Sequence, residues 1–391
     1  MIWGSNLPGP VIGGFTFFPI RIIVIAWVIY SLVKQFKTNE SIKKETIAVL
    51  VFLLFGLIPY IWAPSNPGFL TDFSVYFTMI ICFLMIKSLI KTEDDIKLAL
   101  ISILINYHIL CFASIYESFT GNYIASKVYD YYLVRKNFFG LYMPSGGLGN
   151  VNNLAVVLLC IMPFSLYATE RFKFGLILRV FAFLIGSFVI LLTGSRTGYI
   201  GIIIIAFLYL TYKLIQQKKP LMFMLFIITI PIVISALIIS LQDYASFIVL
   251  VRGIDNEDRW FFWNQTLQTS QEFMFMGCGL GNSLNVNTIL YGANGGNAHN
   301  HFLEILCEFG LFGLIAHIFM FCLMIPQKEN LTIKMNPIIL IFIVVFIISS
   351  ICPSSMIGMY ILWALFALCI RSKKLFKVQC KIVNKKEIVY G

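Results

Sequence analysis

The sequence predicts an all-α polytopic membrane protein with about 11 transmembrane helices, in a range of about 10 to 12. Its 391 residues are 59% hydrophobic and only 12% charged, whereas a soluble domain carries about 25% charged residues. The apolar residues fall in runs of about 20, the length that a helix needs to cross the hydrocarbon of a bilayer. Because such a chain cannot be solvated on all sides, the composition excludes an ordinary soluble domain.

Eleven apolar segments are the expected spans, and mostly short polar connectors separate them. In chain order they lie near residues 11–33, 46–62, 72–90, 97–116, 152–169, 176–193, 198–215, 220–241, 302–325, 336–352 and 355–370. We interpret residues 1–391 as a single transmembrane domain built from these helices.

Lysine and arginine alternate between the two ends of the spans. Most of the 29 Lys and Arg residues follow an odd-numbered span or lie in the tail 371–391. Since basic loops remain in the cytoplasm, we expect that side and the tail to be cytoplasmic and the N-terminus to lie outside. The basic cytoplasmic loops and tail then account for the net charge of +11. The expected partner is therefore the lipid bilayer and not nucleic acid.

Two connectors are long, and this topology places both outside: residues 117–151 and residues 242–301. Long connectors in compact proteins are usually functional or disordered, and these carry aromatic residues and glycines typical of ordered segments. The run from Arg259 to Trp263, followed by Leu267, predicts a short helix at the membrane surface, where tryptophan is favoured. We therefore interpret 242–301 as an external catalytic loop.

Nine cysteines are present, without CxxC pairs or His/Cys clusters at zinc spacing. Cysteines inside apolar runs behave as small hydrophobic residues. The sequence therefore predicts no structural metal, no disulfide framework and no cofactor.

Several ionisable residues fall on the predicted outer face. Arg196 lies in a polar turn, Thr193–Gly198, between two apolar runs. The planar guanidinium of arginine suits phosphate, and a histidine beside it could take a proton from a hydroxyl near neutral pH. Other roles remain open at this point: Arg196 could anchor a lipid headgroup, and Glu304 could cap a helix or orient a histidine. The candidates are Arg135, Arg196, Arg259, His299, Asn300, His301 and Glu304.

One stretch resembles a known family. His299-Asn300, followed after nine residues by Gly310 and after two more by Gly313, resembles the signature of the O-antigen ligase and Wzy-type polysaccharide polymerase superfamily. Three further pieces agree in order: residues 147–155, residues 194–198, and Arg259-Trp260 followed by residues 277–282. The resemblance covers roughly residues 130–315 and is fairly specific because the four pieces occur in order on one predicted face.

The resemblance implies a fold, a substrate class and residue roles. The fold would be GT-C-like, an all-helical membrane glycosyltransferase, and the donor would be an oligosaccharide on undecaprenyl pyrophosphate. By the resemblance, His299 would be the catalytic base, and Arg196 and Arg259 would bind the pyrophosphate. Independently of the resemblance, we expect the remaining candidates to bind substrate. The family works without a metal, and the external loops contain no Asp-x-Asp motif.

The leading interpretation from this resemblance is an inverting polymerase of O-antigen or capsular repeat units at the outer face of the bacterial cytoplasmic membrane. A flippase and a chain-length regulator would be its candidate partners. The alternative is an O-antigen ligase that transfers a finished glycan to lipid A core or protein. A polysaccharide flippase or transporter is disfavoured, because the sequence shows neither an internal repeat nor charges spread over several membrane midplanes.

Overall fold

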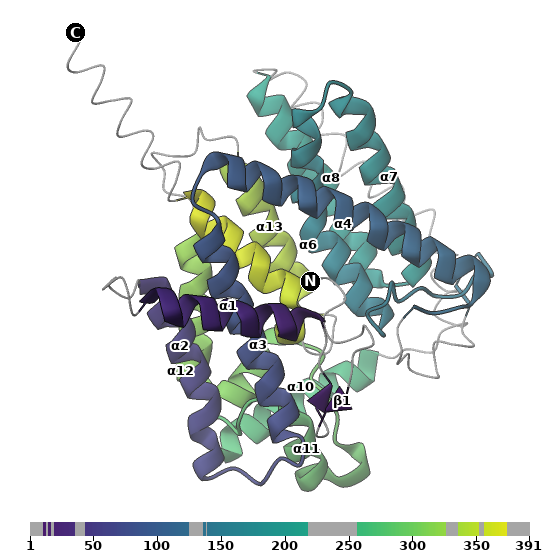
Figure 1. The fold of residues 1–391 in the computed structure, drawn as a ribbon. Helices are drawn as coiled ribbons and strands as arrows, with labels where there is room; N and C mark the ends of the chain where they lie inside the picture. Colours follow the sequence, from purple (N-terminus) through teal and green to yellow (C-terminus); the bar gives the residue numbers. More distant parts are fainter. Residues whose placement is uncertain are drawn as a thin grey trace.

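The computed structural model describes residues 11–12, 15–16, 19–35, 44–124, 136–137, 139–217, 256–325, 335–351 and 356–373. Within these ranges the chain is helical apart from one antiparallel pair of two-residue strands, β1 (Val11–Ile12) and β2 (Phe15–Thr16). The predicted all-α class is therefore confirmed (Figure 1).

Six of the described helices are long and apolar enough to cross a membrane. They are α3 (Phe69–Leu89), α4 (Glu93–Thr120), α6 (Val151–Ala168), α7 (Gly175–Thr193), α8 (Arg196–Gln216) and α12 (His301–Met324). Each coincides with a predicted span.

The other apolar helices are shorter. They are α1 (Pro19–Gln35), α2 (Lys44–Leu57), α13 (Asn336–Ser349) and a helix over residues 360–373. These also match predicted spans, whereas the predicted span 220–241 lies outside the described residues. Between the spans lie α10 (Asn256–Glu272), α11 (Ser283–Tyr291) and the short 3-10 turns η2 (Ile58–Ile61), η3 (Thr169–Arg171), η4 (Gly292–Asn294) and η6 (Met356–Gly358).

Helix α6 forms the centre of one half of the bundle. It packs against α4, α7, α8 and α13, and nearly all of its side chains are buried. Helix α7 instead exposes large apolar side chains, including Leu176 at 69% and Ile177 at 67% exposure. A helix with apolar side chains facing outward is stable only against lipid, so this surface agrees with a membrane protein.

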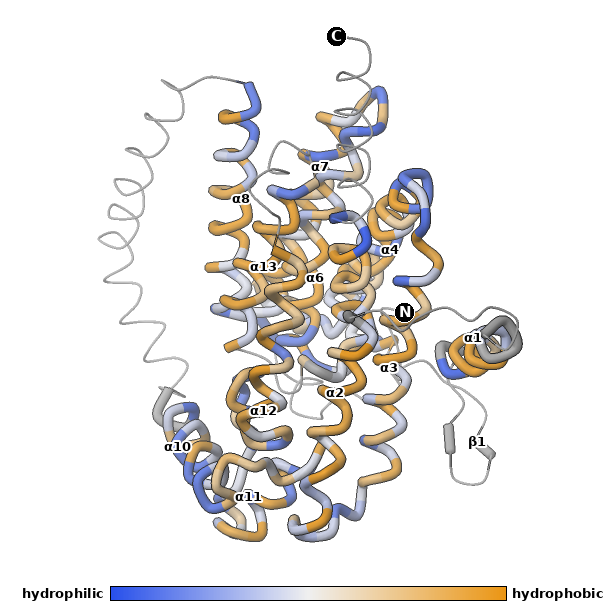
Figure 2. The backbone as a smooth tube through the Cα atoms, turned by 90° about the vertical axis from the view of Figure 1, so that its left-hand side faces the viewer, coloured by the Kyte–Doolittle hydropathy of each residue, from blue (hydrophilic) through white to orange (hydrophobic). Residues whose placement is uncertain are grey.

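The connector helices gather at one end of the molecule. Helices α10 and α11 lie together at the lower end in Figure 2, opposite the end at which α8 terminates. They pack on each other and on α12. The predicted helix at residues 259–267 is therefore present, as part of the longer α10, and it adjoins the start of α12.

Candidate functional site

The approach to α12 presents His299 in an unusual backbone conformation. His299 has φ of 47°, in the left-handed region where histidine is among the few tolerated non-glycine residues. Asn300 follows in extended conformation, and its side-chain oxygen accepts hydrogen bonds from the backbone N–H groups of Phe302 and Leu303. This cap starts the helix at His301 and leaves His299 outside it, half-buried.

Arg259, near the start of α10, acts on His299 electrostatically. Burial of the imidazole, and then the positive charge of Arg259, lower the pKa of His299 below its usual value of 6.5. Both effects disfavour the protonated form. His299 is therefore neutral near pH 7 and able to accept a proton.

A buried amide holds the His299 segment against α10. Asn287 of α11 donates from Nδ2 to the carbonyl oxygen of Gly296 at 2.8 Å, and its Oδ1 accepts the hydroxyl of Thr269 at 2.7 Å. Gln265 of α10 also donates to the carbonyl oxygen of Asn294 at 3.1 Å. These bonds fix the distance between the helix that carries Arg259 and the segment that carries His299.

Helix α12 is broken at Gly310, one of the two glycines of the signature. Its φ of 68° and ψ of −174° are accessible essentially only to glycine. The break frees backbone carbonyls one turn earlier: Cys307 and Glu308 accept from the N–H groups of Cys278 and Gly279 at 2.8 and 2.9 Å. A Cβ at position 310 would lie 2.6 Å from the carbonyl oxygen of Phe275, so the backbone of residues 275–276 packs directly on the break.

Glu308 binds the same loop through its side chain. Its carboxylate accepts from Tyr76 of α3 at 2.9 Å, from the Gly281 N–H at 2.8 Å and from the Ser283 hydroxyl at 2.7 Å. Only 2% of Glu308 is exposed, and a buried carboxylate requires such donors. Two features of α12, the break and this acid, therefore hold the glycine-rich piece 277–282, and residues of the segment 56–64 also bind it.

A second buried acid organises the other glycine-rich piece. Glu117 of α4 accepts from the N–H groups of Ser145 and Gly146, both at 2.7 Å, and of Gly147 at 3.1 Å. Asn150 then caps α6 by accepting from the Asn152 N–H at 2.8 Å. Glu117 therefore holds the backbone of this piece in place just before α6 begins.

Arg196 is the first residue of α8, and its side chain is exposed. Ser195 caps the helix by accepting from the Gly198 N–H at 3.3 Å. Among the described residues, the hydrogen bonds and ion pairs do not link Arg196 to Arg259 or His299. The structure thus brings together two of the three principal candidates, while Arg135 lies outside the described residues.

The remaining candidates belong to α12. His301 is buried, with its Nε2 3.0 Å from Nε2 of His317, and its ring packs edge-on against Phe346. Glu304 is buried in the first turn. Asn300 caps α12, and His301 and Glu304 are buried in its first turn. That these three residues bind substrate remains a prediction.

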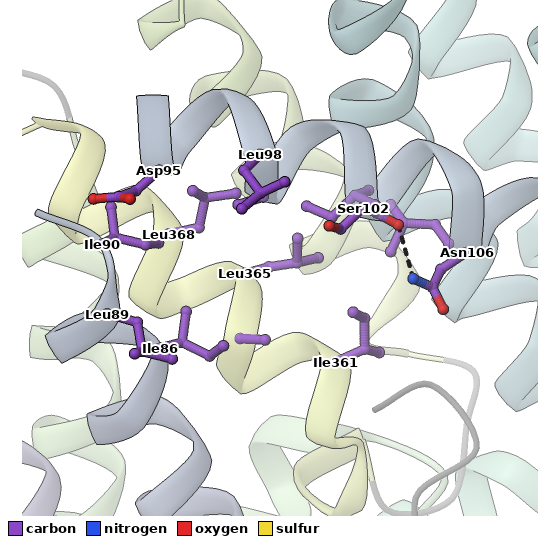
Figure 3. Close-up of a pocket in the computed structure, with 14 residues that line it drawn as sticks. Ile86, Leu89, Ile90, Asp95, Leu98, Ser102, Asn106, Ile361, Leu365 and Leu368 are labelled. Atoms are coloured by element: carbon purple, nitrogen blue, oxygen red, sulfur yellow. Dashed lines mark hydrogen bonds between the residues drawn. The ribbon is translucent and has the colours of Figure 1, made fainter. Parts of the chain in front are cut away.

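An apolar cavity of about 530 Å³ lies elsewhere in the molecule (Figure 3). Its walls come from α3, α4, α6 and the 360–373 helix, and the few polar groups among them include Ser102 and Asn106. None of the predicted site residues lines it.

Asn287, Thr269 and Glu117 were not among the residues that the sequence predicted for the site, and neither was Glu308, the acid inside α12. An acid that deep in an apolar span was itself a signal, because ionisable groups in spans are expensive to bury. Asn287 carried no comparable signal, since its role depends on which helices meet.

Comparisons with known proteins match the part of the chain that contains this site. A family model described as O-antigen ligase matches residues 181–318, from α7 to α12. The chain is also 23% identical over 235 residues to a ComP-specific O-oligosaccharyltransferase of Acinetobacter baylyi (strain ATCC 33305 / BD413 / ADP1). That match covers 56% of this chain and 42% of the relative. The resemblance predicted from the sequence is thereby confirmed: residues 181–318 match the O-antigen ligase family.

Proposed function

We propose that the chain is a membrane oligosaccharide transferase, an O-antigen ligase type of enzyme. It would move an oligosaccharide from undecaprenyl pyrophosphate to a hydroxyl of lipid A core or of a protein, at the outer face of the bacterial cytoplasmic membrane. Two findings support this: the family match spans Arg259, His299 and both signature glycines, and the relative is named as an O-oligosaccharyltransferase.

These findings change the order of the two enzyme interpretations. From the sequence, the polymerase is the leading interpretation and the ligase is the alternative. The family description and the name of the relative both point to transfer onto an acceptor. We therefore propose the ligase type first, and the polymerase, with its flippase and chain-length regulator, becomes an outcome of the test below.

The single observation that carries the proposal is the placement of His299, immediately before the first turn of α12, within electrostatic reach of Arg259 on α10. In the proposed reaction the acceptor hydroxyl oxygen attacks the anomeric carbon, and the bond from that carbon to the pyrophosphate oxygen breaks. His299 takes the hydroxyl proton, undecaprenyl pyrophosphate leaves, and backside attack inverts the centre.

Arg259 would serve both the leaving group and the base. Its guanidinium can pair with pyrophosphate oxygens, which stabilises the charge that develops there. Once pyrophosphate is bound, its negative charge offsets that of Arg259, so the basicity of His299 is expected to rise when the donor is present. Arg196, exposed at the start of α8, is proposed as a further phosphate ligand. The reaction needs no metal in this proposal.

The architecture proposed with this function is a GT-C-like bundle of about 11 spans. Ten described apolar helices coincide with predicted spans, which supports the count. The cluster of α10 and α11 at one end supports a catalytic face on the outer side.

The test is transfer by the purified full-length chain in lipid vesicles, with an undecaprenyl-pyrophosphate oligosaccharide as donor. Lipid A core and a hydroxyl-bearing acceptor protein are supplied in separate reactions. One glycan added per acceptor supports the proposal. A ladder of lengthened lipid-linked glycans without acceptor would instead establish the polymerase, and no product in any reaction would refute both.

A further inference from the structure

Two thiols meet where the 277–282 loop packs on α12. The Sγ atoms of Cys278 and Cys307 are 3.7 Å apart, and the Cys278 N–H donates to the carbonyl oxygen of Cys307 at 2.8 Å. Both side chains are fully buried, with Val286 and Phe273 as apolar neighbours. Cys160 differs, since its sulfur has a serine hydroxyl at 4.0 Å as partner.

We propose that Cys278 and Cys307 form a disulfide bond that fastens this loop to α12. The inference rests on the proposed outward location of residues 242–301, because disulfides persist in oxidising compartments outside the cytoplasm. It departs from the expectation of no disulfide framework. That expectation came from spacing along the chain, and these two cysteines are separated by 29 positions in sequence.

The backbones of Cys278 and Cys307 are in direct contact. Cysteines can be joined only where their backbones lie close and their Cβ atoms are about 3.5–4.5 Å apart. The direct hydrogen bond of 2.8 Å between the two backbones provides the first of these conditions. Rotation about the side-chain bonds then has to bring sulfurs from 3.7 Å to the bonded distance of about 2 Å.

The chemistry is a two-electron oxidation. Each thiol gives up one proton and one electron, the S–S bond forms, and an oxidant of the protein-disulfide class is reduced to its dithiol. The hydrogen bond with Cys307, and then burial, raise the pKa of the Cys278 thiol, so the docked pair reacts slowly. Oxidation therefore takes place before the loop docks, or when it opens.

The disulfide would act on the site through the loop. Glu308 and the break at Gly310 hold residues 277–282 on α12 through non-covalent contacts, including hydrogen bonds. A covalent link at Cys307, between the cap of α12 and its break, would keep the loop in place when those bonds open. The expected consequence is a higher unfolding temperature and slower proteolysis of the loop.

The test uses the purified full-length chain equilibrated with reduced and oxidised glutathione, with diamide as a small oxidant in a parallel series. After acid quenching, alkylation in denaturant and digestion, mass spectrometry measures the linked 278/307 peptide. We expect the linked form to increase as one two-electron couple, to raise the unfolding midpoint, and to disappear with dithiothreitol. Cys278→Ser should abolish the linked peptide and the shift, and Cys160→Ser should preserve both.

Complete alkylation of both thiols under the strongest oxidation, including diamide at the onset of unfolding, would overturn the proposal. A second arm traps thiols with acid in the cells that produce the protein. A linked pair there supports the proposal. A reduced pair in cells would overturn it as a native bond, whatever the purified protein does. Neither arm measures transfer, so failure here leaves the transferase assay to decide the proposed function by itself.

Discussion

Asn287 Nδ2 donates a hydrogen bond of 2.8 Å to the carbonyl oxygen of Gly296, three residues before His299. The same amide accepts the hydroxyl of Thr269 on α10 at 2.7 Å, and Asn287 and Thr269 are both fully buried. One side chain therefore ties the helix of Arg259 to the segment of His299, although it belongs to neither.

Asn287→Asp should lower both stability and activity. The aspartate can still accept the Thr269 hydroxyl, but it puts an oxygen where Nδ2 donated to Gly296. A buried carbonyl left without its donor costs about 1–3 kcal/mol. Thermal unfolding and kcat/KM measure the two effects. Thr269→Val tests the link from the other side: it should couple to Asn287→Asp in a double-mutant cycle, and strict additivity would show that the two side chains act separately.

Arg259→Gln should move the acid limb of the kcat/KM profile to higher pH. The charge of Arg259 contributes, after burial, to lowering the pKa of His299, and the neutral imidazole is the proposed base. Removing the charge raises that pKa, so the base becomes protonated at a higher pH than in the wild type. Arg196→Gln, whose charge is not among the causes of the shift, is the matched control. An acid limb that moves equally in both variants would contradict the specific pairing.

Arg196→Lys should lose at least about tenfold in activity, because a lysine ammonium cannot reproduce the forked contact of a guanidinium with phosphate. The side chain is exposed, so the unfolding temperature should not change. Arg171→Lys, an exposed arginine on the turn between α6 and α7, is the control. Equal losses would mean that general basic character matters and not a specific contact.

Gly310→Ala should destabilise the protein by about 1–3 kcal/mol from backbone strain alone, with an added steric cost. The new Cβ would lie 2.6 Å from backbone atoms of Phe275 and Met276. Gly292→Ala separates the two costs, since Gly292 also has positive φ, at 63°, but nothing lies within 4 Å of its Cβ position. We expect a clearly larger drop in unfolding temperature at 310, and equal drops would argue against the close packing of the loop.

The sequence was sufficient to predict where the helices lie along the chain, but not which residues of different helices contact each other. Apolar runs located α3, α4, α6, α7, α8 and α12, because length and hydropathy alone decide whether a helix can cross a bilayer. The sequence also predicted Arg259 and His299, which the fold brings within electrostatic reach of each other. It could not show that Asn300 is a helix cap or that His301 faces His317, since those roles depend on where the helix starts.

The hydrogen-bond partners of the two glycine-rich pieces could not be predicted from the sequence either. Gly281 binds Glu308, and Gly146 binds Glu117. Each acid lies 27 to 29 positions away along the chain. A local sequence pattern cannot predict a contact between residues that only the tertiary fold brings together. Hydrogen-bonded acids of this kind are visible only once three-dimensional neighbours are known.

The central claim is that His299, and not His301, is the base, and transfer kinetics of two purified variants test it most directly. His299→Asn removes the base while asparagine tolerates the left-handed backbone, so the unfolding temperature should hold. Activity should fall by about a hundred- to ten-thousand-fold. His301→Gln disturbs the buried pair with His317 and should lower the unfolding temperature, yet the folded fraction should keep substantial kcat. An active His299→Asn beside a folded but inactive His301→Gln would contradict the account.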